Sequence, residues 1–314
     1  MCLPPARRFQ DRLFCTKMGK NLPLLAALVP CLALQPVSAT PVRAVGAESQ
    51  YANVIAQIGG PYVSVQAIES SPAVDPHSFE TSPAIARKLS QALLVVRNGL
   101  GYDSWAGKIL KANPDPRRQT IVVQELLDLP RNTRNPHLWY KPQTMPQVAS
   151  AVATALGKLE PAHQAYFQQQ VRLFDTSLKP WYREIARFRT RYAHTPVAVT
   201  EPVADYLLTA MGCDIRTPWP LQAAIMNGTD PAPQDTSFQI RLLEKKAVRF
   251  MVYNRQVTSS LTRLFLEKAR DSSVPVIGAY EIMPAGYSYQ KWMLAETAAL
   301  YRAAAQETAA AGTH

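Results

Sequence analysis

Strand-like apolar runs alternate with helical stretches along most of this chain, and this alternation limits the possible folds more than any other feature. In the first half, residues 61–68, 92–96 and 120–126 are predicted strands, and helices are predicted at Pro83–Ser90 and 104–112. Strands separated by helices in this way form a parallel sheet, because each helix returns the chain to the same edge of the sheet. The first half is therefore predicted to be an α/β unit.

The same pattern returns in the second half of the chain. Two halves of this kind predict an α/β fold of two lobes, each a parallel sheet flanked by helices. The predicted strands lie at 196–201, 248–254 and 274–281, and the predicted helices lie at 203–210, 237–245 and 258–271.

A long amphipathic helix is predicted between the two halves. It begins at Glu160-Pro161, and proline is well tolerated in the first turn of a helix. At 1.5 Å per residue, a helix of roughly 28 residues is about 42 Å long, so it can join two lobes at a nearly fixed separation. Pro180 predicts a bend in this helix, and the alternative is two ordinary helices that meet there. Its apolar face is formed by Phe167, Val171, Phe174, Leu178, Trp181, Ile185 and Phe188. The predicted boundaries are 48–159 for the N-terminal lobe, 160–190 for the connecting helix and 191–306 for the C-terminal lobe.

The first part of the 314-residue chain has the pattern of an export signal. From Met18 a short basic start precedes an apolar run and small residues, which predicts a cleavable signal peptide over residues 1–39 with cleavage after Ala39. Cleavage after Ala47 is a second possibility, and Met18 is a possible true start. The apolar run is shorter than the about 20 residues that span a bilayer, so no stable membrane insertion is expected.

Charge and cysteine content narrow the function classes. Without residues 1–39 the net charge falls from +11 to +7, and the basic residues that are left are scattered. A scattered surplus is typical of a solvated surface, so no nucleic-acid partner is expected. Cys213 is then the one remaining cysteine, so no intrachain disulfide can form. It is expected to be a small buried residue, and a reactive thiol is the alternative.

Two of the five histidines stand in similar local settings. His77 in VDPHSFE and His137 in RNPHLWY each follow a proline, at the end of a loop that leaves a predicted strand. Proline makes these turns rigid, which is useful where a side chain must be aimed. Each histidine alone could be structural, but the pair indicates metal ligands.

Two carboxylates end predicted strands in the second half of the chain. Glu201 closes PVAVTE and Glu281 closes VPVIGAYE, at the strand ends where parallel sheets bind ligands. Glu201 could instead simply favour the dipole of the helix that follows it. Two imidazoles and two carboxylates suit a divalent transition ion. A four-coordinate shell suits Zn²⁺, and bidentate carboxylates suit Mn²⁺ or Fe²⁺, so the metal is left open.

Five sequence stretches occur in order between about residues 50 and 303. They are VDPHSFETSP, LLVVRNGLGYDSW, NPHLWYKP, TEPVADYLL and VIGAYE with YSYQKWM. Together these motifs resemble those of the metal-receptor proteins of bacterial ABC importers for zinc and manganese. The resemblance implies two α/β lobes joined by one rigid helix, with His77 and His137 from the first lobe and Glu201 and Glu281 from the second. It also implies a periplasmic solute-binding protein that delivers its metal to an ABC permease. We further expect a monomer.

The chain departs from the family pattern in three places. Zinc receptors often have a histidine where this chain has Glu201, and the manganese type has glutamate there. The fourth ligand is usually aspartate, and here it is Glu281. The histidine-rich acidic loop of many zinc receptors is absent, because residues 111–120 are short and basic. These differences leave the choice between zinc and manganese open.

The main alternative to a metal receptor is a secreted metal-dependent hydrolase. The chain has no H-E-x-x-H motif, which is typical of zinc proteases. No catalytic residues and no other cofactor-binding residues are predicted. A receptor for a chelated metal would leave His77 and His137 without a role. Trp139 and Tyr140 are expected either to wall the site or to lie in the core. Asn254 and Tyr280 are expected to donate hydrogen bonds near the ligands, or merely to begin loops.

Overall fold

A computed structural model describes residues 40–73, 76 and 79–310 of the chain. Residues 1–39 separate from residues 40–314 as a unit of their own. The predicted signal peptide and the predicted ligand His77 therefore lie outside the described residues.

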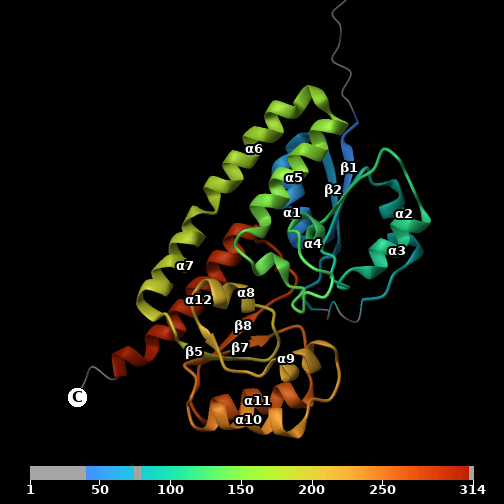
Figure 1. The fold of residues 1–314 in the computed structure, drawn as a ribbon. Helices are drawn as coiled ribbons and strands as arrows, with labels where there is room; N and C mark the ends of the chain where they lie inside the picture. The colour runs from blue at the N-terminus through green and yellow to red at the C-terminus, as the bar shows by residue number, and fades with distance from the viewer. Residues whose placement is uncertain (1–39, 74–75, 77–78, 311–314) are drawn as a thin grey trace, which may run out of the picture. The chain divides into compact units, whose positions relative to one another are not determined.

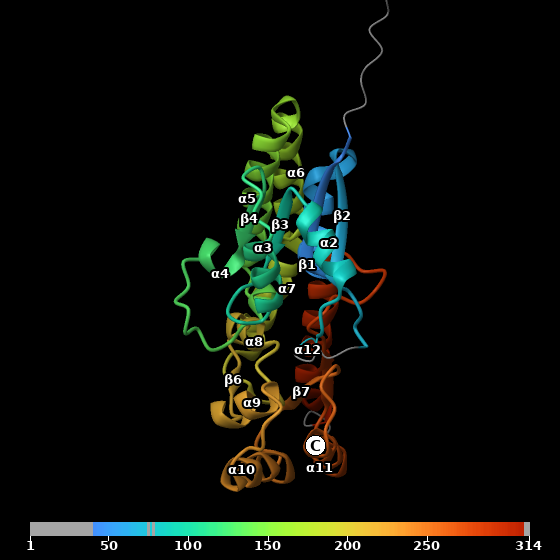
Figure 2. The same cartoon turned by 90° about the vertical axis from the view of Figure 1, so that its right-hand side faces the viewer.

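Residues 40–314 contain two four-stranded sheets in which every strand pair is parallel (Figures 1 and 2). This arrangement confirms the predicted fold class of two α/β lobes. The first sheet has the order β2-β1-β3-β4, with β1 Val42–Glu48, β2 Val63–Glu69, β3 Leu94–Arg97 and β4 Gln119–Val122. The second has the order β6-β5-β7-β8, with β5 Pro196–Val199, β6 Asp214–Ile215, β7 Phe250–Asn254 and β8 Val276–Ala279.

Helices cover both faces of each sheet, so successive residues of a strand enter different apolar cores. In β5, Val197 and Val199 belong to a large core, whereas Ala198 belongs to a smaller core beneath α10 and α11. In β3, Val95 in the same way faces α2 and α3. The helices are α1 Ser49–Gly59, α2 Pro83–Gln91, α3 Ser104–Ala112, α4 Val123–Leu126, α5 Thr144–Leu159, α8 Asp205–Ala210, α9 Trp219–Met226, α10 Pro233–Glu244, α11 Ser260–Asp271 and α12 Tyr289–Ala310, with short 3₁₀ turns η1 Gly60–Tyr62, η3 Leu138–Tyr140 and η4 Pro161–His163.

The predicted connecting helix is present and bent. It consists of α6 Gln164–Ser177 and α7 Lys179–Tyr192, which meet at Leu178. Pro180 stands in the first turn of α7, and the Tyr182 N–H donates to the Leu178 carbonyl across the junction, 3.1 Å. Because Pro180 has no N–H to donate, the helix bends at this junction. Figure 1 shows it running along one side of both sheets, with α12 beside α7.

One apolar core connects the two lobes. The large core contains residues of both sheets together with α5, α6, α7 and α12. Its largest fully buried members include Trp181 of α7 and Trp292 of α12, and the Trp181 Nε1–H donates to Thr297 Oγ1 of α12, 2.9 Å. A second helix, α12, thus packs beside the connecting helix that the sequence predicted.

Candidate metal-binding site

Three of the four predicted ligands lie in the described part of the chain, and all three are buried. His137 immediately precedes η3. Glu201 follows β5, and Glu281 follows β8, in each case after one intervening residue. His137 and Glu281 are 0% exposed and Glu201 is 2% exposed. Buried ionisable groups need a partner or a cation, so the contacts of each side chain matter.

The tautomer of His137 is set by Asn135. Asn135 Oδ1 lies 2.8 Å from His137 Nδ1 and also accepts from the His137 backbone N–H, 2.9 Å. The orientation of this amide is fixed, because Asn135 Nδ2 donates to the Pro202 carbonyl, 2.7 Å. The Nδ1 atom therefore carries a hydrogen, and in the neutral ring Nε2 presents a lone pair.

The Glu281 carboxylate lies directly opposite that lone pair. Glu281 Oε2 is 3.2 Å from His137 Nε2 and accepts a hydrogen bond from the Tyr102 hydroxyl, 2.9 Å. Its backbone N–H donates to Gln256 Oε1, 2.7 Å, which fixes the start of this loop. A nitrogen lone pair and a carboxylate oxygen repel each other unless a proton or a metal ion lies between them.

Asn254 connects the two carboxylates. Its Nδ2 lies 2.6 Å from Glu281 Oε1 and 3.3 Å from Glu201 Oε1. Asn254 ends β7, and its Oδ1 accepts from the Gln256 N–H, 3.0 Å, so the amide can point only its nitrogen at the carboxylates. The expectation that Asn254 donates a hydrogen bond near the predicted ligands is thus confirmed, because its nitrogen contacts Glu201 and Glu281.

The structure therefore brings His137 and Glu281 into contact and joins Glu201 to them through Asn254. Within residues 40–73, 76 and 79–310, no three side chains of His, Cys, Asp or Glu form a cluster that could hold a metal by themselves. The other described histidines lie elsewhere. The His194 side chain is 86% exposed, and His163 stacks on Tyr62 with ring centroids 3.8 Å apart.

Aromatic rings enclose the His137 imidazole. Trp139 and Tyr140 are fully buried, and the edge-on Trp139 ring lies 5.5 Å from the imidazole centroid. Tyr102 also meets the imidazole edge-on. Burial, together with the nearby Glu281 charge, raises the pKa of Tyr102 well above its usual value, so its hydroxyl stays protonated and donates. The sequence did not predict this role for Tyr102.

Three more buried carboxyls lie at the same edge of the first sheet. The parallel register places Glu48 beside Glu69 at the ends of β1 and β2, and Asp103 begins the segment leading to α3. Burial raises the pKa of Glu69 to about 8, although the Trp105 indole N–H donates to its Oε1, 2.9 Å. Burial also raises the pKa of Glu48 and of Asp103. The Glu69 carboxyl is therefore mostly neutral near pH 7. Neither Glu69 nor Glu48 was singled out from the sequence.

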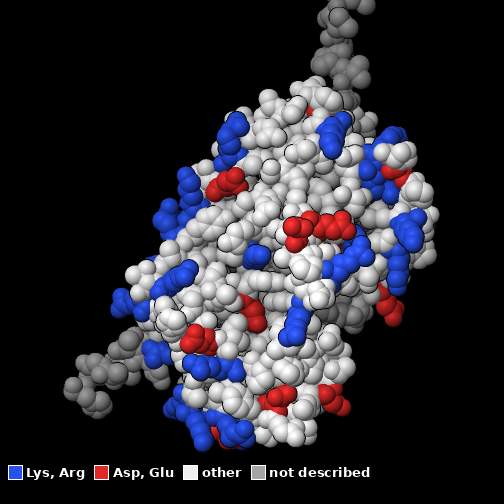
Figure 3. Space-filling view, in the orientation of Figure 1, with Lys and Arg blue, Asp and Glu red and all other residues white. Residues whose placement is uncertain are grey.

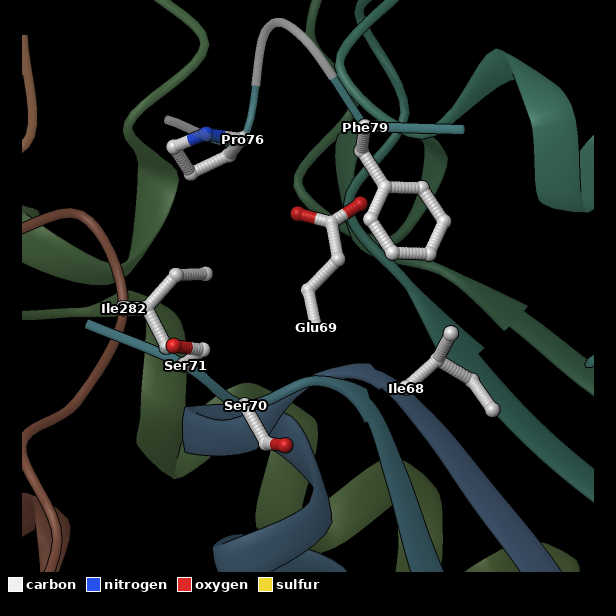
Figure 4. Close-up of a pocket in the computed structure, with 7 residues that line it drawn as sticks. All are labelled: Ile68, Glu69, Ser70, Ser71, Pro76, Phe79 and Ile282. Carbon is white, nitrogen blue, oxygen red and sulfur yellow. The ribbon is translucent and has the colours of Figure 1, made fainter. Parts of the chain in front are cut away.

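The Glu69 side chain lines a cavity of about 120 Å³ (Figure 4). In Figure 4 the Glu69 carboxyl points between Pro76, Phe79 and Ile282. Pro76 directly precedes His77 and Ile282 directly follows Glu281, so the cavity borders two of the chain segments that carry predicted ligands. Its lining is Ile68, Glu69, Ser70, Ser71, Pro76, Phe79 and Ile282.

The surface charge, the helices and the Cys213 thiol were also subjects of sequence-based expectations. On the face shown in Figure 3, Lys and Arg side chains are spread among Asp and Glu and form no single stripe. None of the helices that the structure describes has the length and apolar character needed to cross a bilayer. Burial raises the pKa of the Cys213 thiol to about 12, so it is protonated at neutral pH and behaves as a small partly buried residue.

Several solved structures share this fold of two parallel sheets joined by a bent helix. The solute-binding protein FpvC from Pseudomonas aeruginosa in complex with Mn²⁺ is 21% identical, with a TM-score of 0.70, and the match covers 86% of this chain and 100% of that chain. The periplasmic zinc-binding protein TroA from Treponema pallidum is 15% identical, with a TM-score of 0.70, over 85% of this chain and 99% of that chain. A Cd-bound periplasmic metal-binding protein from Candidatus Liberibacter asiaticus is 16% identical, with a TM-score of 0.65, and the match covers 83% of this chain and 98% of that chain.

The sequence itself identifies the family. Residues 45–303 match the family model described as "Zinc-uptake complex component A periplasmic", and the chain belongs to this family. Members of this family are periplasmic metal-binding transport receptors and not enzymes. The alternative of a secreted metal-dependent hydrolase is accordingly not favoured.

Proposed function

We propose that this protein is a periplasmic receptor that captures one divalent transition metal ion with His77, His137, Glu201 and Glu281 and delivers it to an ABC permease. The observation that supports this proposal most strongly is the 3.2 Å contact of His137 Nε2 with Glu281 Oε2. The Asn135 contact places the hydrogen on Nδ1 and so leaves the Nε2 lone pair directed at the carboxylate. A metal ion between these atoms satisfies both.

The proposed cargo is Zn²⁺ or Mn²⁺, and the same donors also accommodate Fe²⁺. Imidazole nitrogens disfavour Mg²⁺ and Ca²⁺, which prefer shells of oxygen atoms. Among the structures compared above, FpvC is in complex with Mn²⁺ and TroA is described as zinc-binding. Carboxylate denticity decides between four-coordinate Zn²⁺ and a higher coordination number.

We also propose that residues 1–39 are a signal peptide that is removed on export. Cleavage after Ala39 keeps all of β1, whereas cleavage after Ala47 would remove most of a strand that pairs with both β2 and β3. Removal of an inner strand would expose the edges of its two neighbours. The fold therefore favours the first site. The proposed lobes and helix keep the boundaries 48–159, 160–190 and 191–306, with β1 adding residues from Val42 to the first lobe.

Titration of the chelator-stripped protein with Mn²⁺ and with Zn²⁺ tests the proposal. We expect one ion per chain. We expect at least a tenfold loss of affinity in His137→Ala and in Glu281→Ala, because each removes one of the four ligands. The matched control is His194→Ala, which removes an exposed histidine and should bind as the unchanged protein does. Equal binding by His137→Ala, Glu281→Ala and the control would overturn the proposed site.

A further inference from the structure

The Tyr140 hydroxyl lies between two of the segments that carry proposed ligands. Tyr140 comes three residues after His137, at the end of η3. Its hydroxyl donates to the carbonyl of Tyr280, 2.8 Å away, and Tyr280 directly precedes Glu281. The hydroxyl also lies 2.6 Å from Glu296 Oε2 of α12. One atom thus connects the first-lobe ligand segment, the second-lobe ligand segment and a helix that packs beside the connecting helix.

The number of hydrogens limits how Tyr140 and Glu296 can share their bond. The Tyr140 hydroxyl has one hydrogen but two close oxygen neighbours, the Tyr280 carbonyl and Glu296 Oε2. A carbonyl oxygen only accepts, so both contacts are satisfied when the Glu296 carboxyl carries a hydrogen and donates to Tyr140. Glu296 also accepts from the Trp292 indole N–H, 2.6 Å from Oε1, and from the backbone N–H of Tyr280.

Helix α12 holds η3 at a second point. The hydroxyl of Tyr289 donates to the Trp139 carbonyl, 2.7 Å. Tyr140 and Tyr289 are both 0% exposed, and the bond of Tyr289 to Trp139 is fully buried, so water does not compete for that bond. The backbone just before Tyr140 is therefore anchored to α12, while the Tyr140 side chain reaches the end of β8.

We propose that the Tyr140 hydroxyl, oriented by Glu296, is a positioning group that sets the separation of His137 from Glu281 and thereby the geometry of the metal site. This inference rests on the proposed function. Tyr140 does not itself contact the proposed metal. Metal–ligand distances in protein sites are held to within about 0.2 Å, so a bond between two ligand-bearing segments strongly affects affinity. Without the bond of Tyr140 to Tyr280, η3 and the end of β8 are connected less directly, so His137 and Glu281 can separate.

Tyr140→Phe tests this role, and Tyr182→Phe is a matched control. The Tyr182 hydroxyl also donates to a backbone carbonyl, that of Pro142, 3.0 Å, but this bond does not connect one ligand-bearing segment to the other. We expect at least a tenfold loss of Mn²⁺ and Zn²⁺ affinity in Tyr140→Phe and unchanged affinity in Tyr182→Phe. The visible absorption spectrum of bound Co²⁺, which reports coordination geometry, should change in Tyr140→Phe alone.

A pair of Glu296 variants extends the test and covers the case in which Tyr140→Phe does not fold. Glu296→Gln keeps a donor for Tyr140 and an acceptor for Trp292, so it should retain the affinity and Co²⁺ spectrum of the unchanged protein. Glu296→Leu removes both and should lose affinity and alter the spectrum. If Tyr140→Phe and Glu296→Leu bind metal with unchanged affinity and spectrum while His137→Ala loses binding, the positioning role is wrong and the proposed function stands. If the unchanged protein binds no metal, the proposed function itself fails.

Discussion

At the scale of single residues, Asn135 has the largest expected effect on the candidate site without being a proposed ligand. It accepts from His137 Nδ1 and from the His137 N–H, and it donates to the Pro202 carbonyl next to Glu201. Asn135 therefore orients the proposed ligand His137 and connects the segment of His137 to that of Glu201. Groups that orient metal-bound histidines in this way affect affinity about 10- to 100-fold.

We predict that Asn135→Ala lowers metal affinity by about 10- to 100-fold, because the His137 ring loses the partner that fixes its tautomer. The protein should also lose about 1–3 kcal/mol of unfolding free energy, because buried polar groups are left without partners. Asn135→Asp keeps an acceptor for Nδ1 and should lose less affinity. Competition with a metal chelator measures both variants. Equal affinity losses in Asn135→Ala and Asn135→Asp would contradict a role in fixing the tautomer.

Local signals were enough to predict three described candidate ligands and Asn254, but not the other residues that contact them. His137 follows a proline-stiffened turn, and Glu201 and Glu281 end predicted strands, so each stands out within a few residues of sequence. Tyr102 and Glu281, by contrast, are 179 positions apart, and Tyr140 and Glu296 are 156 apart. Such contacts depend on how the two lobes pack, and no short motif records them. The fourth predicted ligand, His77, stays a prediction.

At the scale of elements, the bent helix and α12 form one packed pair. The Trp181 ring is 1% exposed and meets Tyr289 edge-on with ring centroids 5.8 Å apart, and its indole N–H donates to Thr297. This contact lies in the core shared by both lobes. The pair therefore contributes to the stability of the whole described unit.

Trp181→Ala is predicted to cost about 3–5 kcal/mol of unfolding free energy, because it empties a large volume in a close-packed core. The control is Leu173→Ala on α6, whose side chain is 55% exposed and whose loss should change the free energy by less than about 0.5 kcal/mol. Urea unfolding of the metal-free variants measures both values. Similar values for the two variants would show that the contact between α7 and α12 is not part of the stabilising core.

There are physical reasons why the sequence did not predict β1, α12 and β6. β1 contains small residues that resemble a cleavage site, but Gly46 is needed there because a β-carbon would collide with the backbone of Ala52 in α1. α12 packs against α1, α7 and β8, so its apolar residues do not follow a single stripe. β6 has only two residues. The other six strands and the bend at Pro180 carried strong local patterns and were predicted, but the predicted strand 120–126 ends at Val122 and its second half forms α4.

At the scale of the whole molecule, buried neutral carboxyls control the pH dependence of stability. Burial raises the pKa of Glu296 to about 8 and that of Asp205 to about 7, from ordinary values of 4.5 and 3.8. Each group therefore keeps its proton in the folded state at pH values where the unfolded chain has lost it. Its stabilising contribution is full below the ordinary pKa and is lost as the pH rises through the folded-state pKa.

We predict that the unfolding free energy of the metal-free protein falls as the pH rises from about 4.5 to about 8. Each such group contributes at most about 1.4 kcal/mol per pH unit. Glu296→Gln removes one of these groups, so its unfolding free energy should fall less steeply across this range. Denaturant unfolding at a series of pH values measures the slope. A stability that rises over this range, or an unchanged slope in Glu296→Gln, would contradict a protonated Glu296.

The central claim is that ligands from both lobes bind one metal ion, and a crystal structure of the Mn²⁺-loaded protein tests it most directly. We predict a single anomalous-difference peak bonded to His137 Nε2 and to carboxylate oxygens of Glu201 and Glu281 at about 2.0–2.3 Å, with His77 completing the site. A peak bonded to other residues, or no peak while the Glu281 carboxylate still contacts His137, would contradict the account.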